Sequence, residues 1–356
     1  MNERNASPQT VLPAHSSTLS LFRSFTHSFA MSLYEHQLNT ILNGLRIDPT
    51  QKLITLTGDE TRSDYKPETL HTTLAGLIYR HFYSVSGSSG PATASETSDA
   101  FVNELSRHNQ SAERFDSGWK IESVDMAGVP YAAKGNYRRM LYMGEFVYDT
   151  AKRGAAQTGD TVRVHMHREN RDAQSGFYYV FGQTPGEDSI VLQTRLYFHI
   201  TPEGSNQLID WLTKTLNTYR IPFQFKCLNH PDLYSRSDAA VLYLQKPSVN
   251  IVLDLLTDAL PTLSPYLRPA TPLFTRTITS GVGFAESPPN PNESFGTSRC
   301  GLIAQGIANA VSREQSAETY EQSVRDVFDQ IGLSLEHPYR NPQSHYPYVF
   351  PDYSVN

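Results

Sequence analysis

The order of apolar and polar residues divides the chain into an early helical part and a later part made of short alternating runs. Apolar residues recur at helical spacing over residues 32–45, 67–83 and 99–107. The stretch SGSSGPATASETSD (86–99) has the Gly and Ser content of a loop. We therefore expect the first 110 residues to be helical, and they contain no cluster of candidate catalytic residues.

Beyond Trp119 the period of the pattern changes from helical spacing to strict alternation. The alternating runs are KIESVDMAG, VPYAAKGNYRRML, TVRVHMHR, GFYYVFG, IVLQTRLYFHI, FQFKC and AAVLYL. Helical spacing returns at 203–219 and again at 248–260. Strands, helix, strands and helix in this order predict an α+β fold, in which helices flank a largely antiparallel sheet.

These changes of texture predict three parts of the chain. Residues 1–30 are rich in Ser, Thr and Asn, so we expect a disordered segment. A helical N-terminal region should follow over 31–115, and the α+β domain should occupy 116–356. The composition of the first part is also typical of type III secreted proteins.

Composition and charge limit the classes of partner. A formal net charge of −6 argues against general affinity for nucleic acid. The chain has no apolar run near the roughly 20 residues that span a bilayer, so we expect no membrane partner. Cys227 and Cys300 are the only cysteines, too few for a disulfide scaffold or a structural zinc site. These features fit a cytoplasmic location.

One candidate site comes from the polar side of the alternating runs. Because strand side chains alternate between faces, RLYFHI (195–200) places its apolar residues on one face and its polar residues on the other. The runs TVRVHMHR and FQFKC have the same form. If the three strands are neighbours, one face collects Arg163, His165, His167, Arg195, Tyr197, His199 and Lys226.

So many basic donors on one face would repel one another unless an anion lies among them. Phosphate suits such a face, because Arg offers a planar fork and Lys a compact charge. Arg236 and Asp238 follow on a predicted turn. A solvated face carrying exposed Arg and His would give the same alternation, and that alternative stays open.

The same residues limit the chemistry. His165 and His167 share a face, but they lack nearby carboxylate ligands on that strand and Arg163 would oppose a cation, so we predict no metal. A lysine that removes a proton and a histidine that donates one suit expulsion of a phosphate. Lys226 and His199 are the candidates, since imidazole titrates in the right range.

Two stretches, 195–244 and 272–307, resemble the HopA-type type III effector family. The likeness covers roughly residues 120–350, and ESFGTSRC (293–300) is among its most specific parts. Members of that family are also found as lyase components of lanthipeptide- and thioamitide-type peptide biosynthesis. There they act beside a kinase-like phosphotransferase, so the resemblance implies such a partner.

A fainter resemblance is to the phosphothreonine lyases, which carry a histidine on one strand, then a helix, then a lysine on the next strand. His199, the helix 203–219 and Lys226 follow that order. The resemblance implies a phosphothreonine-lyase-like fold, with Lys226 as general base and His199 as general acid. It implies phosphate contacts from Arg195 and Arg236, whereas Tyr197 stands where those lyases have a lysine.

Arg299 is a further candidate phosphate contact. It follows ESFG at the predicted start of a helix, and helix N-termini favour anions. Pairing with a structural carboxylate is the other reading of this arginine.

The activity implied is β-elimination of phosphate from phosphoserine or phosphothreonine in a precursor peptide or a phosphoprotein. The products would be dehydroalanine and dehydrobutyrine, and the reaction requires no cofactor. Two alternatives remain: a type III effector secreted into a host cell, and a non-catalytic module that recognises phosphate.

Overall fold

A computed structural model describes residues 32–58, 61–84, 98–135, 137–184, 193–290 and 293–351. The predicted disordered segment 1–30 and most of the predicted loop 86–99 lie outside these residues. Ser32–Asn356 forms one compact unit. Within it, helices combine with antiparallel sheets, which confirms the predicted α+β class.

The predicted N-terminal helices are present, and a small sheet lies between them. The helical segments are α1 (Leu33–Gly44), η1 (Pro67–Thr69), α2 (Leu70–Ile78), the π-helical turn η2 (Tyr79–Tyr83) and α3 (Asp99–His108). Strands β1 (Leu45–Asp48), β2 (Leu53–Leu56) and β3 (Arg62–Asp64) form an antiparallel sheet. The sequence pattern does not predict this sheet, because strands of three or four residues are too short to show a period.

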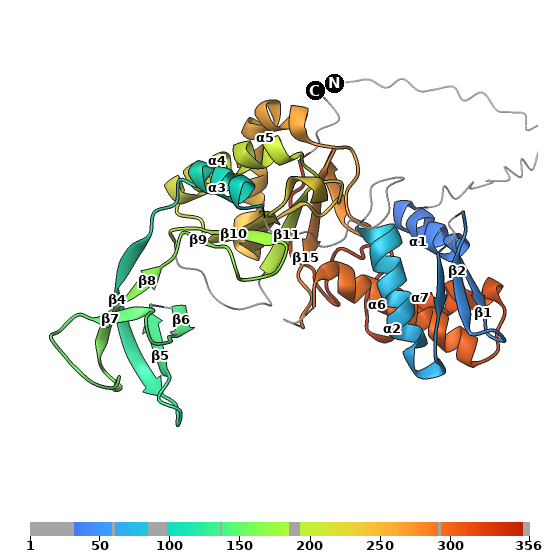
Figure 1. Ribbon diagram of the computed structural model, residues 1–356, viewed down its shortest axis with the longest axis horizontal. Helices are drawn as coiled ribbons and strands as arrows, with labels where there is room; N and C mark the ends of the chain where they lie inside the picture. The colour runs from blue at the N-terminus through green and yellow to red at the C-terminus, as the bar shows by residue number, and fades with distance from the viewer. Residues whose placement is uncertain are drawn as a thin grey trace, which may run out of the picture. The chain divides into compact units, whose positions relative to one another are not determined.

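The central layer is a seven-stranded antiparallel sheet in the order β14-β15-β11-β13-β12-β10-β9. Its strands are β9 (Glu169–Asn170), β10 (Phe177–Phe181), β11 (Gln193–Phe198), β12 (Phe223–Leu228), β13 (Ala240–Gln245), β14 (Arg276–Thr279) and β15 (Val282–Glu286). Leu196, Phe225 and Leu242 lie on one face and are fully buried. Helices α4 (Pro202–Thr218) and α5 (Val249–Leu263) lie on one side of this sheet (Figure 1). Their apolar stripes share one core with these strands.

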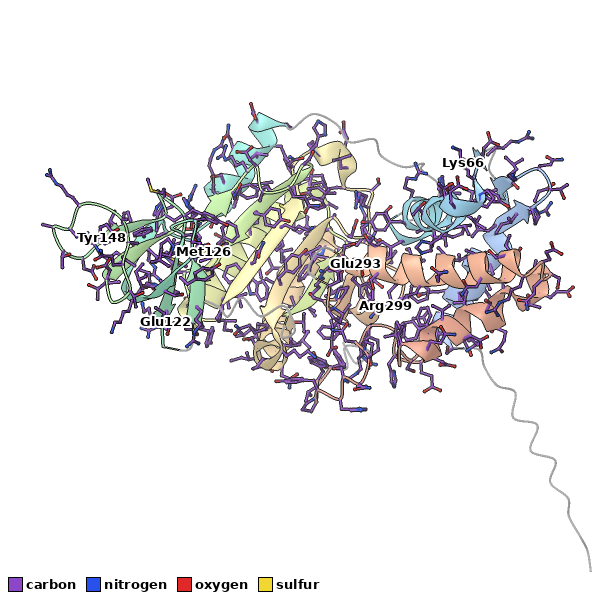
Figure 2. The ribbon with its side chains drawn as sticks, turned by 90° about the horizontal axis from the view of Figure 1, so that it is seen from below. Lys66, Glu122, Met126, Tyr148, Glu293 and Arg299 are labelled. Carbon is purple, nitrogen blue, oxygen red and sulfur yellow. The ribbon has the colours of Figure 1, made fainter. Side chains whose placement is uncertain are left out.

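A second antiparallel sheet has five strands in the order β6-β5-β4-β8-β7. They are β4 (Arg114–Val124), β5 (Pro130–Lys134), β6 (Tyr137–Met140), β7 (Phe146–Tyr148) and β8 (Thr161–Met166). Figure 2 labels Glu122, Met126 and Tyr148 in this part of the chain. It has a separate apolar core, formed by Trp119, Ile121, Ala132, Leu141, Val162 and Val164.

The C-terminal helices return to the N-terminal ones. Helix α6 (Phe295–Ser312) packs against α2, and α7 (Tyr320–Gln330) packs against both α6 and α1. Ser294 caps α6 through a hydrogen bond from the Thr297 amide. Gly296 lies so close to Tyr83 that a Cβ there would collide with the tyrosine ring. The predicted region 31–115 therefore shares its core with the end of the chain.

Candidate functional site

The two sheets separate residues that the sequence analysis placed together. β8, which carries Arg163 and His165, pairs with β4 and β7, whereas β11 pairs with β13 and β15. The prediction that Arg163 and His165 share a face with Arg195 is therefore wrong. Arg163 pairs with Asp149 (Nε to Oδ1 3.4 Å), and His165 lies 3.8 Å from the Glu113 carboxylate. Alternation within a strand is local information and does not identify the neighbouring strand.

Arg195 and Lys226 do share one face of the seven-stranded sheet, as their alternation predicted. The register across the sheet places side chains in two rows on this side, which we call the polar face. The first row holds Phe181, Gln224, Tyr243 and Arg195. The second, one step along the strands, holds Tyr179, Lys226, Val241 and Tyr197.

Tyr243 lies between the two cations of the polar face. The Lys226 Nζ is 5.9 Å from the centroid of the Tyr243 ring, and the Arg195 Cζ is 5.3 Å from it. Lys226 is half-buried, lies 4.2 Å from the Phe177 ring centroid and donates a 3.0 Å hydrogen bond to the Gln174 Oε1. Aromatic faces attract cations, so these rings fix the position of the amine.

Arg195 is buried, with 8% of its surface exposed, yet no carboxylate of the described residues pairs with it. Its Nε donates to the Ser287 Oγ (3.0 Å), and an Nη lies 3.4 Å from the Glu293 carbonyl oxygen. Burial raises the pKa of the neighbouring Tyr197, which keeps that phenol neutral. A buried guanidinium without a counter-charge suits an anionic ligand.

The structure does not bring His199 into contact with Lys226. His199 follows β11 and lies on the same face, but β13 separates it from β12. Strand spacing puts the two Cα atoms about 12 Å apart. The ring is 2% exposed, and its Nδ1 lies 3.1 Å from the Ala270 carbonyl oxygen. Burial lowers the pKa of His199, which disfavours the protonated form that a general acid must supply.

Arg236 is occupied by a partner within the protein. Its Nε donates to the Asp238 Oδ1 (2.8 Å), and an Nη donates to the Oδ2 (2.9 Å). The anion beside Arg236 is thus an aspartate two residues away, and the prediction of a phosphate contact is not supported here.

Arg299 lies inside the protein at the start of α6 (Figure 2). It is 2% exposed and donates hydrogen bonds to the carbonyl oxygens of Pro338 (2.8 Å) and Arg340 (2.9 Å). Burial lowers its pKa to about 10. Arg299 holds the C-terminal segment, so the predicted phosphate contact is wrong because the guanidinium has no route to a ligand.

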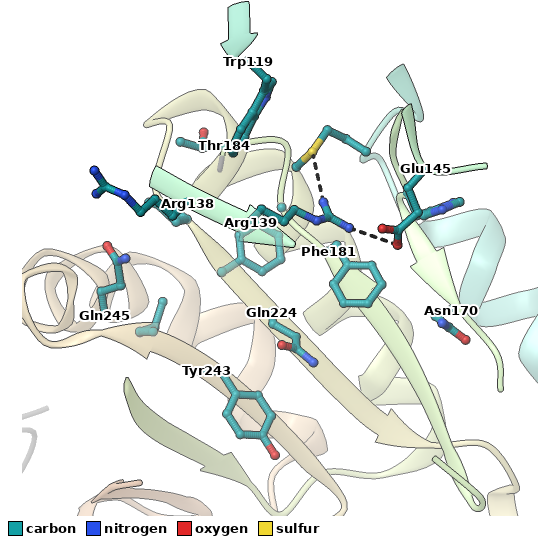
Figure 3. Close-up of a pocket in the computed structure, with 16 residues that line it drawn as sticks. Trp119, Arg138, Arg139, Glu145, Asn170, Phe181, Thr184, Gln224, Tyr243 and Gln245 are labelled. Atoms are coloured by element: carbon teal, nitrogen blue, oxygen red, sulfur yellow. Dashed lines mark hydrogen bonds and ion pairs between the residues drawn. The ribbon is translucent and has the colours of Figure 1, made fainter. Parts of the chain in front are cut away.

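A cleft of about 400 Å³ opens beside the first row of the polar face (Figure 3). Residues of both sheets line it, among them Trp119, Arg139, Glu145, Met166, Phe181, Phe223, Gln224 and Tyr243. Sequence reasoning missed Tyr243 and the aromatic residues of β10. The runs AAVLYL and GFYYVFG did carry the signal, since alternation puts Tyr243 on one face and Phe177, Tyr179 and Phe181 together.

Comparison with known proteins identifies a class of bacterial effector proteins. Residues 168–340 match the model of the HopA1 effector protein family. The matched part contains Arg195, Lys226 and Tyr243 but not the five-stranded sheet. The resemblance of the sequence to the HopA-type effector family is confirmed. No curated protein matches the chain significantly.

Two solved structures are similar to this chain. The effector protein from Pseudomonas syringae pv. tomato strain DC3000 is 15% identical, with 86% of this chain and 96% of that one covered and a TM-score of 0.46. The effector protein from Pseudomonas syringae pv. syringae strain 61 is 15% identical, with 84% and 100% covered and a TM-score of 0.42. None of the helices in the described ranges has the length and apolar character needed to cross a bilayer.

Proposed function

We propose that this protein is an effector-family lyase that removes phosphate from phosphoserine or phosphothreonine in a peptide by β-elimination. The observation that carries the proposal is the placement of Lys226 and Arg195 on either side of Tyr243. Neither cation pairs with a carboxylate of the described residues. The Lys226 amine acts as a base in its uncharged form, while the Arg195 guanidinium offsets the charge of a phosphate.

In this mechanism the phosphate ester lies over Tyr243, toward Arg195, and the substrate Cα faces Lys226. The free amine of Lys226 takes the Cα proton and becomes an ammonium. The electron pair of the broken C–H bond forms the Cα=Cβ double bond, and the Cβ–O bond breaks. Phosphate leaves with the electron pair of the broken Cβ–O bond, while Arg195 offsets its negative charge.

The geometry does not support proton donation by His199. The buried ring bonds the Ala270 carbonyl, and β13 separates it from Lys226. We therefore assign His199 to the support of the segment around Ala270, and the leaving phosphate takes its proton from water.

The test is incubation of the full chain with phosphoserine and phosphothreonine peptides, followed by mass spectrometry. We expect loss of phosphoric acid with the wild type, and a rate lower by about 10² to 10⁴-fold with Lys226→Ala. Lys226→Arg keeps the charge but not the base and should be equally slow. Lys214→Ala, at an exposed position of α4, is the control. Full activity of both Lys226 variants would refute the assigned base.

Recognition of phosphate without chemistry is the second candidate, because two cations beside a ring can bind phosphate as they stand. A phosphopeptide that binds the wild type, releases no phosphate and loses affinity in Lys226→Ala would favour it. We also propose that the substrate is either a host phosphoprotein or a precursor peptide supplied by a kinase-like phosphotransferase. Loss of phosphate after that partner is added would favour the precursor peptide.

A further inference from the structure

The cleft between the two sheets is continuous with the polar face. Gln224 and Tyr243 line the cleft, and Tyr243 also contacts both Lys226 and Arg195. Gln224 and Lys226 are two residues apart on β12, so the cleft begins about 7 Å from the lysine along the strand. An extended peptide bound at Lys226 would therefore reach the cleft within a few residues.

The cleft walls combine polar side chains with an apolar part that suits an uncharged group. Its apolar part is formed by Trp119, Met166, Phe181, Pro222, Phe223 and Leu244, and its polar part includes His167, Asn170, Thr184, Gln224, Tyr243 and Gln245. Its ionisable groups lie beside partners: an Arg139 Nη is 3.5 Å from the Glu145 Oε1, as Figure 3 shows, and the His167 Nδ1 is 4.0 Å from the Glu113 Oε1. Arg138 likewise pairs with Glu122 (2.9 Å). A charged side chain entering here would lose water and gain no free counter-charge.

Two polar groups that line the cleft have hydrogen-bonding capacity that no other described residue uses. The side-chain amide of Gln224 and the hydroxyl of Tyr243 make no hydrogen bond to another described residue, and both side chains are half-buried. Figure 3 shows the Gln224 amide between Phe181 and Tyr243. Half-buried polar groups without partners are suited to hydrogen bonding with a ligand. An amide offers both a donor and an acceptor, which matches a peptide backbone.

We propose that this cleft is a specificity subsite for the peptide substrate. It takes one bulky apolar side chain, such as Leu or Phe, two to four residues from the phosphorylated residue, while the Gln224 amide bonds the intervening backbone. The range follows from the 7 Å offset and an advance of about 3.3 Å per extended residue. The inference rests on the proposed function for the position of the phosphorylated residue.

The probe is a fluorescently labelled, Ala- and Ser-based peptide with one phosphothreonine and a single Leu moved along it, bound to the full chain. We expect affinity to rise about tenfold when Leu stands two to four residues away on one side. A peptide with Asp in place of this Leu should not show the increase in affinity. Phe181→Ala should remove the preference for Leu. Phe115→Ala, at an exposed aromatic residue of β4, is the matched control.

The same series without phosphate separates this inference from the lyase proposal. A preference for Leu that depends on Phe181 supports the subsite even if no peptide ever loses phosphate. Equal affinity at every Leu position, a preference that persists in Phe181→Ala, or no binding of any peptide would overturn the subsite. Loss of phosphate without any preference for Leu would overturn the subsite and leave the lyase proposal in place.

Discussion

Asn109 and Arg168 exchange two hydrogen bonds, from the Asn109 Nδ2 to the Arg168 carbonyl oxygen (3.0 Å) and from an Arg168 Nη to the Asn109 carbonyl oxygen (3.1 Å). The whole five-stranded sheet lies between these two residues in the sequence. The chain therefore leaves the rest of the described protein at Asn109 to form this sheet, and it returns at Arg168 to the same point. The family match begins at residue 168, where the chain returns.

This connection predicts that the five-stranded sheet can be removed. Replacing residues 113–167 with a short Gly/Ser linker should leave a cooperatively folding protein, because the sheet has its own core and its ends already meet. Circular dichroism during urea unfolding measures this. The shortened protein should keep phosphate elimination and lose the preference for an apolar neighbour. Aggregation or non-cooperative unfolding of the shortened protein would contradict the prediction. Removal of α3 is the contrasting case: because this helix buries Val102 and Leu105, its loss should cause non-cooperative unfolding.

Arg236 should contribute to stability rather than to binding. In Arg236→Ala the Asp238 carboxylate, whose side chain is 9% exposed, loses a two-point partner. Removing one member of a buried pair lowers the free energy of unfolding by about 3 kcal/mol. The Arg236→Ala/Asp238→Ala double variant should be less destabilised, since no charge is left unpaired. Urea denaturation checks both, and loss of phosphopeptide affinity at unchanged stability would restore the ligand role.

Glu286 should make the C-terminal segment sensitive to acid. It is fully buried and accepts hydrogen bonds from Lys246 (2.8 Å), Tyr348 (2.8 Å) and the Asn341 amide (2.8 Å). Burial alone would raise the pKa of this carboxyl, but these bonds outweigh it and hold the pKa below its usual value. The unfolded chain therefore takes up the proton first, at about pH 4.3.

The stabilisation from Glu286 is thus complete above that value and is lost as the pH falls through the folded-state pKa. Glu286→Gln should be less stable than the wild type at pH 7, and the difference should shrink below about pH 4. Unfolding midpoints of the wild type and of Glu286→Gln, measured from pH 7 to below about pH 4, test whether the difference in stability shrinks in acid. A difference that grows in acid would contradict it.

His199 should affect stability more than turnover. Because burial lowers the pKa of its imidazole, the unfolded chain binds the proton first as the pH falls below about 6.5. The wild type should therefore lose stability between neutral pH and mild acid, and His199→Gln should lose less of it. Phosphate release by His199→Gln should stay within about tenfold of the wild type, below the losses typical of a missing general acid. Abolished release at unchanged stability would identify His199 as the acid.

Sequence reasoning succeeded where the information is local. A strand period of two fixes that Arg195 opposes Leu196 and that Lys226 opposes Phe225, whatever the neighbours are. The helix between these strands was equally plain, since α4 keeps its apolar spacing over 17 residues. The side of its own strand on which Arg195 or Lys226 lies could therefore be predicted, whereas their common sheet depends on the pairing of both strands with β13.

The residues whose positions were predicted wrongly are placed by contacts between segments that are distant in the sequence. Whether Arg163 joins the same face is decided by the partner of β8, and nothing in TVRVHMHR specifies β4. Arg299 is buried by a segment about 40 residues later, in contact with Pro338 and Arg340. Asp238, by contrast, stands two residues from Arg236, so that ion pair was visible in the sequence as a local alternative to phosphate.

The close approach of Gly296 to Tyr83 links two positions that lie on either side of the family boundary. A methyl group at 296 can be accommodated only if the ring at 83 is smaller or α2 moves away from α6. Substitution at one of these sites thus restricts what the other can tolerate, and relatives with a larger residue at 296 should carry a compensating change at 83. We therefore expect the N-terminal helices and the family-matched region to have evolved together.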